Sequence, residues 1–443
     1  MLFKFLKYLQ PSHYFQLYKS SGSSVFPIVL DLPVSISEQF ILDGNYSCVL
    51  AQQYDASWRL VQAGYIGNCN TYETFETIAI IDEYRFVRKY FNSFWVLYVL
   101  LLRIFSFKNP IIEIKSWYLT RKTKRFHPED APIKYVDWGN FSSDLVEKSL
   151  KVSVIIPTLN RYEYLKDVFK DLEQQSYKNF EVIIVDQSEP YQVEFYKDFN
   201  LEINLIRQEE KALWLARNTA IKAAKGTLIA LSEDDVRIQP NWIEAHLKCL
   251  DFFDASISAG VFYPLHQSLP KSRSYFTLAS QFATGNALLY KDVFKDVGLF
   301  DRQFEGQRMG DGEFGLRVYR KDIKSISNPF AACVDVKAAS GGLRFMGSWD
   351  AFRPTKLLSP RPIPSVLYFY RSYFGTQRAK LALLKTVPLS IMPYQFKSNK
   401  AMMILGVFVS LLLLPLVLFQ VFKSWRLSSE KLKQGPMIEE LVP

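Results

Sequence analysis

The chain has 443 residues, more than one ordinary hydrophobic core accommodates, so two or three folded units are expected. Its 49% apolar content is that of a folded protein. Lys and Arg outnumber Asp and Glu by 54 to 44, and the resulting charge of +10 suits an anionic membrane or a nucleic acid. The four cysteines form no CxxC pair, which argues against a zinc knuckle or a disulfide framework and favours a reducing compartment.

Residues 1–120 are predicted to form a small β-rich unit with one apolar helix. Short apolar or alternating runs at 26–30 and 46–50 are separated by turn residues, which is typical of short strands. The apolar segment 94–107 is short for a bilayer span and carries Arg103, so a buried or interfacial helix is expected. The basic, apolar start is broken at Pro11, and export is not predicted.

Residues 121–150 are predicted to be a basic linker. The cluster from Arg121 to Arg125 is followed by Pro128 and Pro132, a composition typical of a solvated linker that could also touch anionic lipid.

The pattern of apolar residues changes in residues 151–345, where predicted apolar strands alternate with predicted helices. Such alternation predicts an α/β domain with a Rossmann-like, mostly parallel sheet covered on both faces. The expected strands are 152–157, 180–186, 203–206 and 227–232, and the expected helices are 165–172 and 213–224.

Residues 346–443 are predicted to be an amphipathic, membrane-associated region. The apolar run 401–422 has about the length needed to cross a bilayer, but Pro415 interrupts it and basic residues flank both sides. A spanning helix is favoured, with a re-entrant or in-plane helix and a buried soluble helix as alternatives.

Acidic residues end two of the predicted strands. Ligands bind at the carboxyl ends of parallel strands, so Asp186 and the triplet Glu233, Asp234 and Asp235 are the candidate site. Three adjacent acids need compensation, and their hard oxygens suit Mg²⁺ or Mn²⁺. The structural alternatives are an Asx turn at Asp186 and a helix cap within the triplet.

Several segments in this order resemble the family 2 glycosyltransferases, which have a GT-A fold. They are residues 154–161, 185–188, 215–218 and 232–235, followed by 284–287, 297–301 and 310–317. The resemblance covers roughly residues 151–344. It implies a metal-dependent, inverting enzyme that transfers a hexosyl or related group from a nucleotide diphospho-sugar, with a UDP-sugar favoured.

The resemblance also implies roles for single residues. Asp186 matches the acid that binds the donor's base, and Asp311 matches the base that deprotonates the acceptor. Glu233 and Asp235 match ligands of a divalent cation, Mn²⁺ or Mg²⁺, with Asp335 as a further oxygen ligand. The full donor-binding set is Pro157, Thr158, Asn160, Arg161, Asp186, Arg217, Asp234 and Arg344.

The chain departs from the family pattern at two positions. The family often has an acid where this chain has Gly310, and a metal-binding His where it has Asp335. Glu313 and Arg317 are spaced as an i,i+4 surface pair, with a role in substrate binding as the equal alternative. The adjacent pair Gly341–Gly342 permits a mobile loop that would bring Arg344 to the diphosphate, with plain turn glycines as the equal alternative.

These observations predict transfer of one or a few sugars to a glycan or lipid-linked acceptor, by a membrane-associated enzyme whose catalytic domain faces the cytoplasm. The alternative is a catalytically inactive nucleotide-binding scaffold or sensor at the membrane. A nucleotidyltransferase is disfavoured because residues 156–161 contain no Gly-rich phosphate loop. Nucleic acid is not an expected partner, because the basic residues of the catalytic part do not cluster around aromatics.

Overall fold

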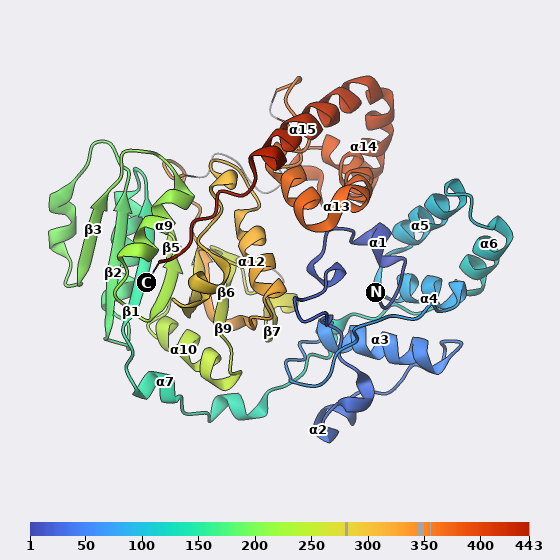
Figure 1. Ribbon diagram of the computed structural model, residues 1–443, viewed down its shortest axis with the longest axis horizontal. Coiled ribbons are helices and arrows are strands. Elements are labelled where there is room, and N and C mark those ends of the chain that lie inside the picture. The colour runs from blue at the N-terminus through green and yellow to red at the C-terminus, as the bar shows by residue number, and fades with distance from the viewer. Residues whose placement is uncertain (280–281, 344–349, 355, 443) are drawn as a thin grey trace. The chain divides into compact units, whose positions relative to one another are not determined.

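The computed structural model describes residues 1–279, 282–343, 350–354 and 356–442. The chain divides into two compact units, whose elements are labelled in Figure 1. Unit 1 comprises Met1–Ile133 and Tyr370–Leu412, and unit 2 comprises Lys134–Phe369 and Leu413–Pro443.

Unit 2 is built on a mixed sheet of nine strands within the described residues. The strand order is β3-β2-β1-β4-β8-β6-β9-β5, and β7 pairs with β9. The strands are β1 (Val152–Thr158), β2 (Phe180–Asp186), β3 (Ile203–Arg207), β4 (Leu228–Ser232), β5 (Val236–Arg237), β6 (Ile257–Pro264), β7 (Thr277–Leu278), β8 (Asn286–Tyr290) and β9 (Ser325–Asp335).

The prediction of a mostly parallel sheet is right for the half that contains β3, β2, β1 and β4, whereas the other half combines the parallel pair β6–β9 with antiparallel pairs. Strands β3, β2, β1 and β4 are parallel neighbours, as expected from their apolar runs and the helices between them. β8, however, enters between β4 and β6 and is antiparallel to both. The apolar pattern of a strand does not encode its direction, so the sequence could not reveal this insertion.

Helices cover the sheet of unit 2 where the periodicity predicts them. Leu165, Phe169 and Leu172 of α8 are buried in the same core cluster as the sheet, and α9 packs on β1 and β2. The helices are α7 (Asp144–Glu147), α8 (Tyr162–Glu173), α9 (Leu213–Ala223), α10 (Trp242–Phe252), α11 (Val293–Val297), α12 (Gly310–Arg320) and α15 (Leu414–Gln434).

Unit 1 is helical, so the prediction of a β-rich N-terminal unit is wrong. Within its described residues the only strand-like pairing is an isolated bridge between Pro27 and Thr71. The helices are α1 (Leu6–Leu9), α2 (Val34–Ser37), α3 (Val49–Gln62), α4 (Ile80–Tyr90), α5 (Ser93–Phe105), α6 (Pro110–Leu119), the part of α13 (Pro364–Thr386) from Tyr370 onward, and α14 (Lys400–Leu412).

The physical reason for this difference lies in α3. The run that we expected to be a strand continues with buried Ala51, Tyr54, Trp58 and Val61, which recur at helical spacing. These side chains complete an aromatic core, in which the Trp58 ring meets the Phe86 ring edge-on at 5.2 Å. Packing against that core over four turns outweighs the short alternating pattern at the start of the segment.

The apolar C-terminal run forms two helices instead of one. α14 ends at Leu412 and α15 begins at Leu414, with Pro415 in its first turn. Proline lacks a backbone N–H and cannot continue a helix, which explains the break. Among the described helices none is long and apolar enough to cross a membrane by itself. Only α14 and α15 together meet that length and composition, and they are joined at a sharp bend.

Candidate active site

Three polar segments follow the carboxyl ends of neighbouring strands in unit 2. β1 ends at Thr158 and β2 at Asp186, and these two residues are partners in the parallel register. The acids Glu233 to Asp235 follow β4, which pairs with the opposite side of β1. The structure therefore brings the predicted donor loop, Asp186 and the acidic triplet to one edge of the sheet.

Asp186 is fully buried and accepts three hydrogen bonds. The Tyr162 and Tyr196 hydroxyls donate to Oδ2 at 2.6 and 2.9 Å, and the Ser188 N–H donates to Oδ1 at 2.8 Å. The last contact is an Asx turn, which the sequence offered as the structural alternative to a binding role for Asp186. Burial, together with the Asp186 carboxylate, raises the pKa of both tyrosines, which keeps the phenols protonated as donors.

Arg161 joins two acids of the triplet. Its Nη1 lies 2.9 Å from Oδ1 of Asp234 and 3.0 Å from Oδ2 of Asp235. The Thr158 hydroxyl donates to the other Asp234 oxygen at 2.8 Å. Burial raises the pKa of the Asp234 carboxyl to about 6, and the Arg161 guanidinium acts in the opposite direction. The Arg161 guanidinium therefore compensates two carboxylates at the strand end.

Glu233 turns away from that pair toward α9. Its Oε1 lies 3.7 Å from Nη2 of Arg217, which is buried beside the Trp214 ring. A Cβ on Gly285 would lie 2.5 Å from the Glu233 carboxyl carbon, so this acid can approach the segment before β8 only because residue 285 is glycine. Glu233 thus approaches the segment that contains Thr284, whose hydroxyl donates to Asp311.

The loop after β9 closes over Arg161. The Arg161 Nε donates to the Ser340 carbonyl at 3.3 Å, and the Gly342 N–H donates to the Leu159 carbonyl at 2.8 Å. Gly342 has φ +86°, and a side chain there would overlap the Arg161 guanidinium. The predicted donor contact Arg344 lies outside the described residues.

Asp335 ends β9 opposite Val236 and accepts the Lys337 N–H at 3.1 Å. Asp235 accepts the nearby Ala338 N–H at the same distance. In the part of the chain that the structure describes, no group of three or more His, Cys, Asp or Glu side chains is arranged to hold a metal ion. The predicted ligands Glu233, Asp235 and Asp335 therefore share a neighbourhood without forming a ligand cluster.

Asp311 is the second residue of α12 and is half-buried. The Thr284 hydroxyl donates a hydrogen bond to its Oδ1. Asp311 lines a small recess. The other lining residues are Leu213, Trp214, Gly306, Gln307, Arg308, Met309, Gly310 and Leu343. A reacting group in this recess would meet the Asp311 carboxylate.

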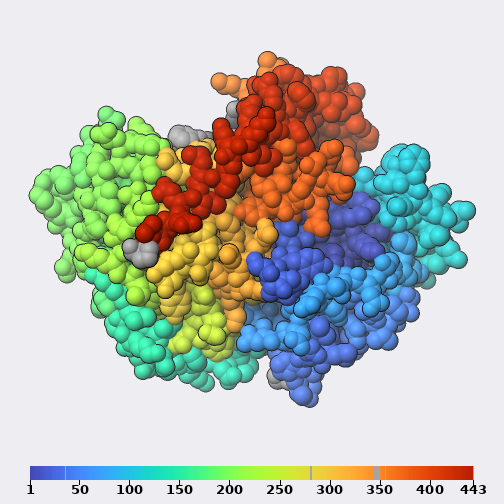
Figure 2. Space-filling view, in the orientation of Figure 1, coloured from blue at the N-terminus to red at the C-terminus, as the bar shows by residue number. Residues whose placement is uncertain are grey.

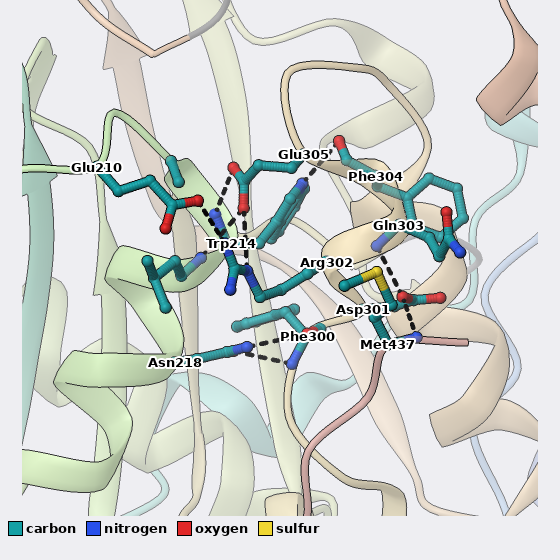
Figure 3. A network of polar contacts seen from close by, with 12 residues as sticks. Glu210, Trp214, Asn218, Phe300, Asp301, Arg302, Gln303, Phe304, Glu305 and Met437 are labelled. Atoms are coloured by element: carbon teal, nitrogen blue, oxygen red, sulfur yellow. Dashed lines mark hydrogen bonds and ion pairs between the residues drawn. The ribbon is translucent and has the colours of Figure 1, made fainter. Parts of the chain in front are cut away.

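A polar network fixes this recess to α9 (Figure 3). Glu305 accepts the Trp214 and Leu215 N–H groups at 3.0 and 3.2 Å, which satisfies two donors at the N-terminus of α9. The Asn218 amide and the Phe300 backbone exchange two hydrogen bonds of 2.9 and 3.0 Å. Hydrogen bonds therefore connect α9, which carries Arg217, to the segment 300–305 that precedes Asp311.

Sequence analysis did not identify the two tyrosines on Asp186 or the cap at Glu305. Tyr162 directly follows the donor loop, and Tyr196 lies in the short 3-10 helix Val193–Asp198 after β2. Neither position has a spacing that singles it out. Glu305 accepts from Trp214, which lies 91 residues earlier in the chain, so no local capping pattern exists.

The central part of the chain is similar to known glycosyltransferases. A family model described as glycosyl transferase family 2 matches residues 153–298. Residues 153–298 are a family 2 glycosyltransferase domain. The predictions of this family and of a transferase are confirmed for this part of the chain, and Asp311 lies beyond the matched residues.

Two curated relatives come from Streptococcus pneumoniae. The glycosyltransferase GlyA is 28% identical over 163 residues, which cover 36% of this chain and 22% of GlyA. The glycosyltransferase GlyG is 30% identical over 182 residues, which cover 40% of this chain and 58% of GlyG. The chain thus spans less than two thirds of the length of either relative.

Among solved structures, residues 1–349 of TarS from S. aureus in complex with UDP-GlcNAc align with a TM-score of 0.44 at 16% identity. The alignment covers 65% of this chain and 92% of that one.

Gly310 lies beyond the matched residues, at a position where the family often has an acid. This departure from the family pattern has a structural explanation. The Trp214 indole lies against Gly310, and its Nε1 donates to the Phe304 carbonyl at 3.1 Å. A Cβ on Gly310 would overlap the indole ring. The acid that the family often has at this position is therefore sterically incompatible with Trp214.

Alanine substitutions at two glycines of α12 test this packing. Gly310→Ala is expected to lower the free energy of unfolding of unit 2 by about 1–3 kcal/mol, because the methyl group overpacks Trp214. Gly312→Ala is the matched control, since its Cβ would lie 3.6 Å from the Phe369 ring, an ordinary contact. The control is expected to be neutral or stabilising by up to about 1 kcal/mol. Equal stability of the two variants in urea titrations would contradict the account.

Proposed function

We propose that the chain transfers a sugar from a nucleotide diphospho-sugar to an acceptor hydroxyl with inversion at the anomeric carbon. The observation that carries this proposal is a continuous set of contacts across the sheet edge. Asp186 is the strand partner of Thr158, which donates to Asp234. On the other side of the triplet, Glu233 approaches Gly285, whose neighbour Thr284 donates to Asp311.

The donor's base would bind at Asp186. A carboxylate offers about four lone-pair sites, and three at Asp186 already accept hydrogen bonds. The remaining site suits an N–H donor such as the imide of uracil, which supports a UDP-sugar as the favoured donor. Pro157 lies in β1, and the loop that follows with Asn160 is held beside Asp186, because the Asn160 N–H donates to the Ser188 hydroxyl at 2.7 Å.

The donor's diphosphate would lie over the acidic triplet with a divalent cation. The chemistry of the residues fits a hard cation such as Mn²⁺ or Mg²⁺, because Glu233 and Asp235 offer carboxylate oxygens at one strand end. When bound, the cation would neutralise charge that develops on the leaving diphosphate. Arg161 would share Asp235 with it, and Arg217 would supply further positive charge for phosphate oxygens, together with Arg344, which lies outside the described residues.

Asp311 would act as the general base. Thr284 orients its carboxylate, and the adjacent recess would admit the acceptor hydroxyl. As that oxygen attacks the anomeric carbon, its proton passes to Asp311 and the nucleoside diphosphate leaves from the opposite side. Attack from the face opposite the leaving group inverts the configuration.

The acceptor is proposed to be a glycan or lipid-linked intermediate at the cytoplasmic face of a membrane, with one or a few sugars added. This proposal is supported by the apolar surface of α14, where Leu405, Phe408, Leu411 and Leu412 are exposed. Such a surface suits contact with lipid.

The substitution Asp311→Asn is expected to lower kcat about 10²- to 10⁴-fold, because the amide cannot accept the acceptor's proton. UDP binding should be unchanged, since Asp311 is not on the proposed donor side. Asp296→Asn, at an exposed acid of α11, is the matched control. Release of the nucleoside diphosphate, UDP or GDP, from a panel of UDP- and GDP-sugars measures turnover, and full activity in Asp311→Asn would sink the mechanism.

Removal of divalent cations by EDTA is expected to abolish turnover, and Mn²⁺ or Mg²⁺ should restore it. Glu233→Gln should raise the cation concentration needed for half-maximal rate at least about tenfold, since a carboxylate ligand becomes a weaker amide. Turnover that persists in EDTA would rule out the proposed cation.

The alternative is a nucleotide-binding scaffold without catalytic activity. It predicts that UDP binds to the purified chain while no sugar in the donor panel is transferred or hydrolysed. Calorimetry and the turnover assay on the same preparation separate the two functions.

A further inference from the structure

The helical hairpin α5–α6 of unit 1 has an apolar outer surface that the transfer reaction does not explain. α5 and α6 are joined by the short turn Ser106–Asn109, and Figure 2 shows the hairpin as a cyan lobe at the right-hand edge. Its exposed apolar residues are Phe94, Leu97, Leu101, Phe105, Phe107, Ile111, Ile112, Ile114, Tyr118 and Leu119. An exposed apolar area of this kind indicates an interaction surface.

The apolar residues of α5 form one continuous stripe. Phe94, Leu97, Leu101 and Phe105 follow one another at spacings of three and four residues, which is one face of a helix. Phe107 stands at the tip of the turn and is 98% exposed. The stripe therefore runs along the helix and ends in an aromatic side chain that projects from the turn.

The inner face of the hairpin is held rigidly within unit 1. The Arg103 Nε donates to the buried Glu113 carboxylate at 3.0 Å, and the Tyr84 hydroxyl of α4 donates to the same carboxylate at 2.7 Å. Arg88 of α4 donates to the Trp117 carbonyl at 2.8 Å. Because these contacts fix the polar groups of the inner face, the apolar stripe is presented outward.

The exposed charged side chains of the segment 93–125 all have one sign. Glu113 is the only acid between Ser93 and Arg125, and it is buried and paired with Arg103. Six basic side chains of the same segment are exposed: Lys108, Lys115, Arg121, Lys122, Lys124 and Arg125. A segment that carries an apolar stripe and whose exposed charged side chains are all cations complements a surface that is apolar below and anionic above, which is the surface of an anionic bilayer.

We propose that the α5–α6 hairpin docks on anionic lipid, with Phe105 and Phe107 inserted among the acyl chains and the basic residues at the headgroups. α5 has 13 residues and is about 20 Å long, less than the roughly 30 Å of a bilayer core. The hairpin therefore lies in the interface without crossing it. This proposal does not rest on the transfer reaction, and it concerns a different segment from α14 and α15.

The test uses the full chain with vesicles of phosphatidylcholine, with or without phosphatidylglycerol. A fluorescent probe is attached at Phe107→Cys after the accessible Cys48 and Cys69 are replaced by serine. We expect brominated lipid to quench the probe only on vesicles that contain phosphatidylglycerol. The matched control is a probe at Leu30→Cys, an exposed apolar position of unit 1 that precedes an acid, and it should stay unquenched.

A second variant reports on affinity. The double variant Phe105→Ser, Phe107→Ser should lower the vesicle partition coefficient at least about tenfold. Added salt should weaken the binding of the wild-type chain to the same vesicles. An unquenched probe at position 107 on a vesicle-bound chain would overturn the proposal and assign the binding to another segment. Absence of vesicle binding, or a dimer that the serine variant dissociates, would also overturn it, and the dimer would identify a second copy of the chain as the occupant.

Discussion

The ion pairs of Arg161 with Asp234 and Asp235 are the interaction on which the geometry of the candidate site depends. Three successive acids at one strand end repel one another, and burial makes their charge still more costly. The guanidinium compensates two of them at 2.9 and 3.0 Å, and it also binds the Ser340 carbonyl. It therefore ties the loop after β1, the turn after β4 and the loop after β9 together.

This arrangement explains why glycine is needed at two places around the cluster. Gly342 leaves room for the guanidinium itself, and Gly285 leaves room for Glu233. Both glycines belong to loops whose sequence alone permits many conformations. Their necessity becomes clear only when the side chain that occupies the space is known.

The donor half of the site could be predicted because its residues are local to strand ends. The apolar runs of β1, β2 and β4 give the strands, and the ends of parallel strands share one edge, so Asp186 and the triplet had to be close. The direction of β8 could not be predicted, since it depends on which strands it meets. The exclusion of an acid at Gly310 likewise depends on Trp214, which lies 96 residues earlier in the chain.

Unit 1 was predicted less well for a related reason. Its short runs are ambiguous between strand and helix, and only the packing of Trp58 and Phe86 in an aromatic core decides the outcome. The expectation of a helix in the apolar segment 94–107 is confirmed by α5. Its partner α6, which completes the amphipathic hairpin, was not recognised.

The most direct measurement of the central claim is a calorimetric titration of UDP into the full chain in the presence of Mn²⁺. The account predicts that wild type binds UDP, that Asp186→Asn weakens binding roughly tenfold or more through loss of a charged acceptor, and that the exposed-site variant Asp198→Asn binds as wild type does. Equal UDP affinity of wild type and Asp186→Asn would contradict a donor site at the strand ends.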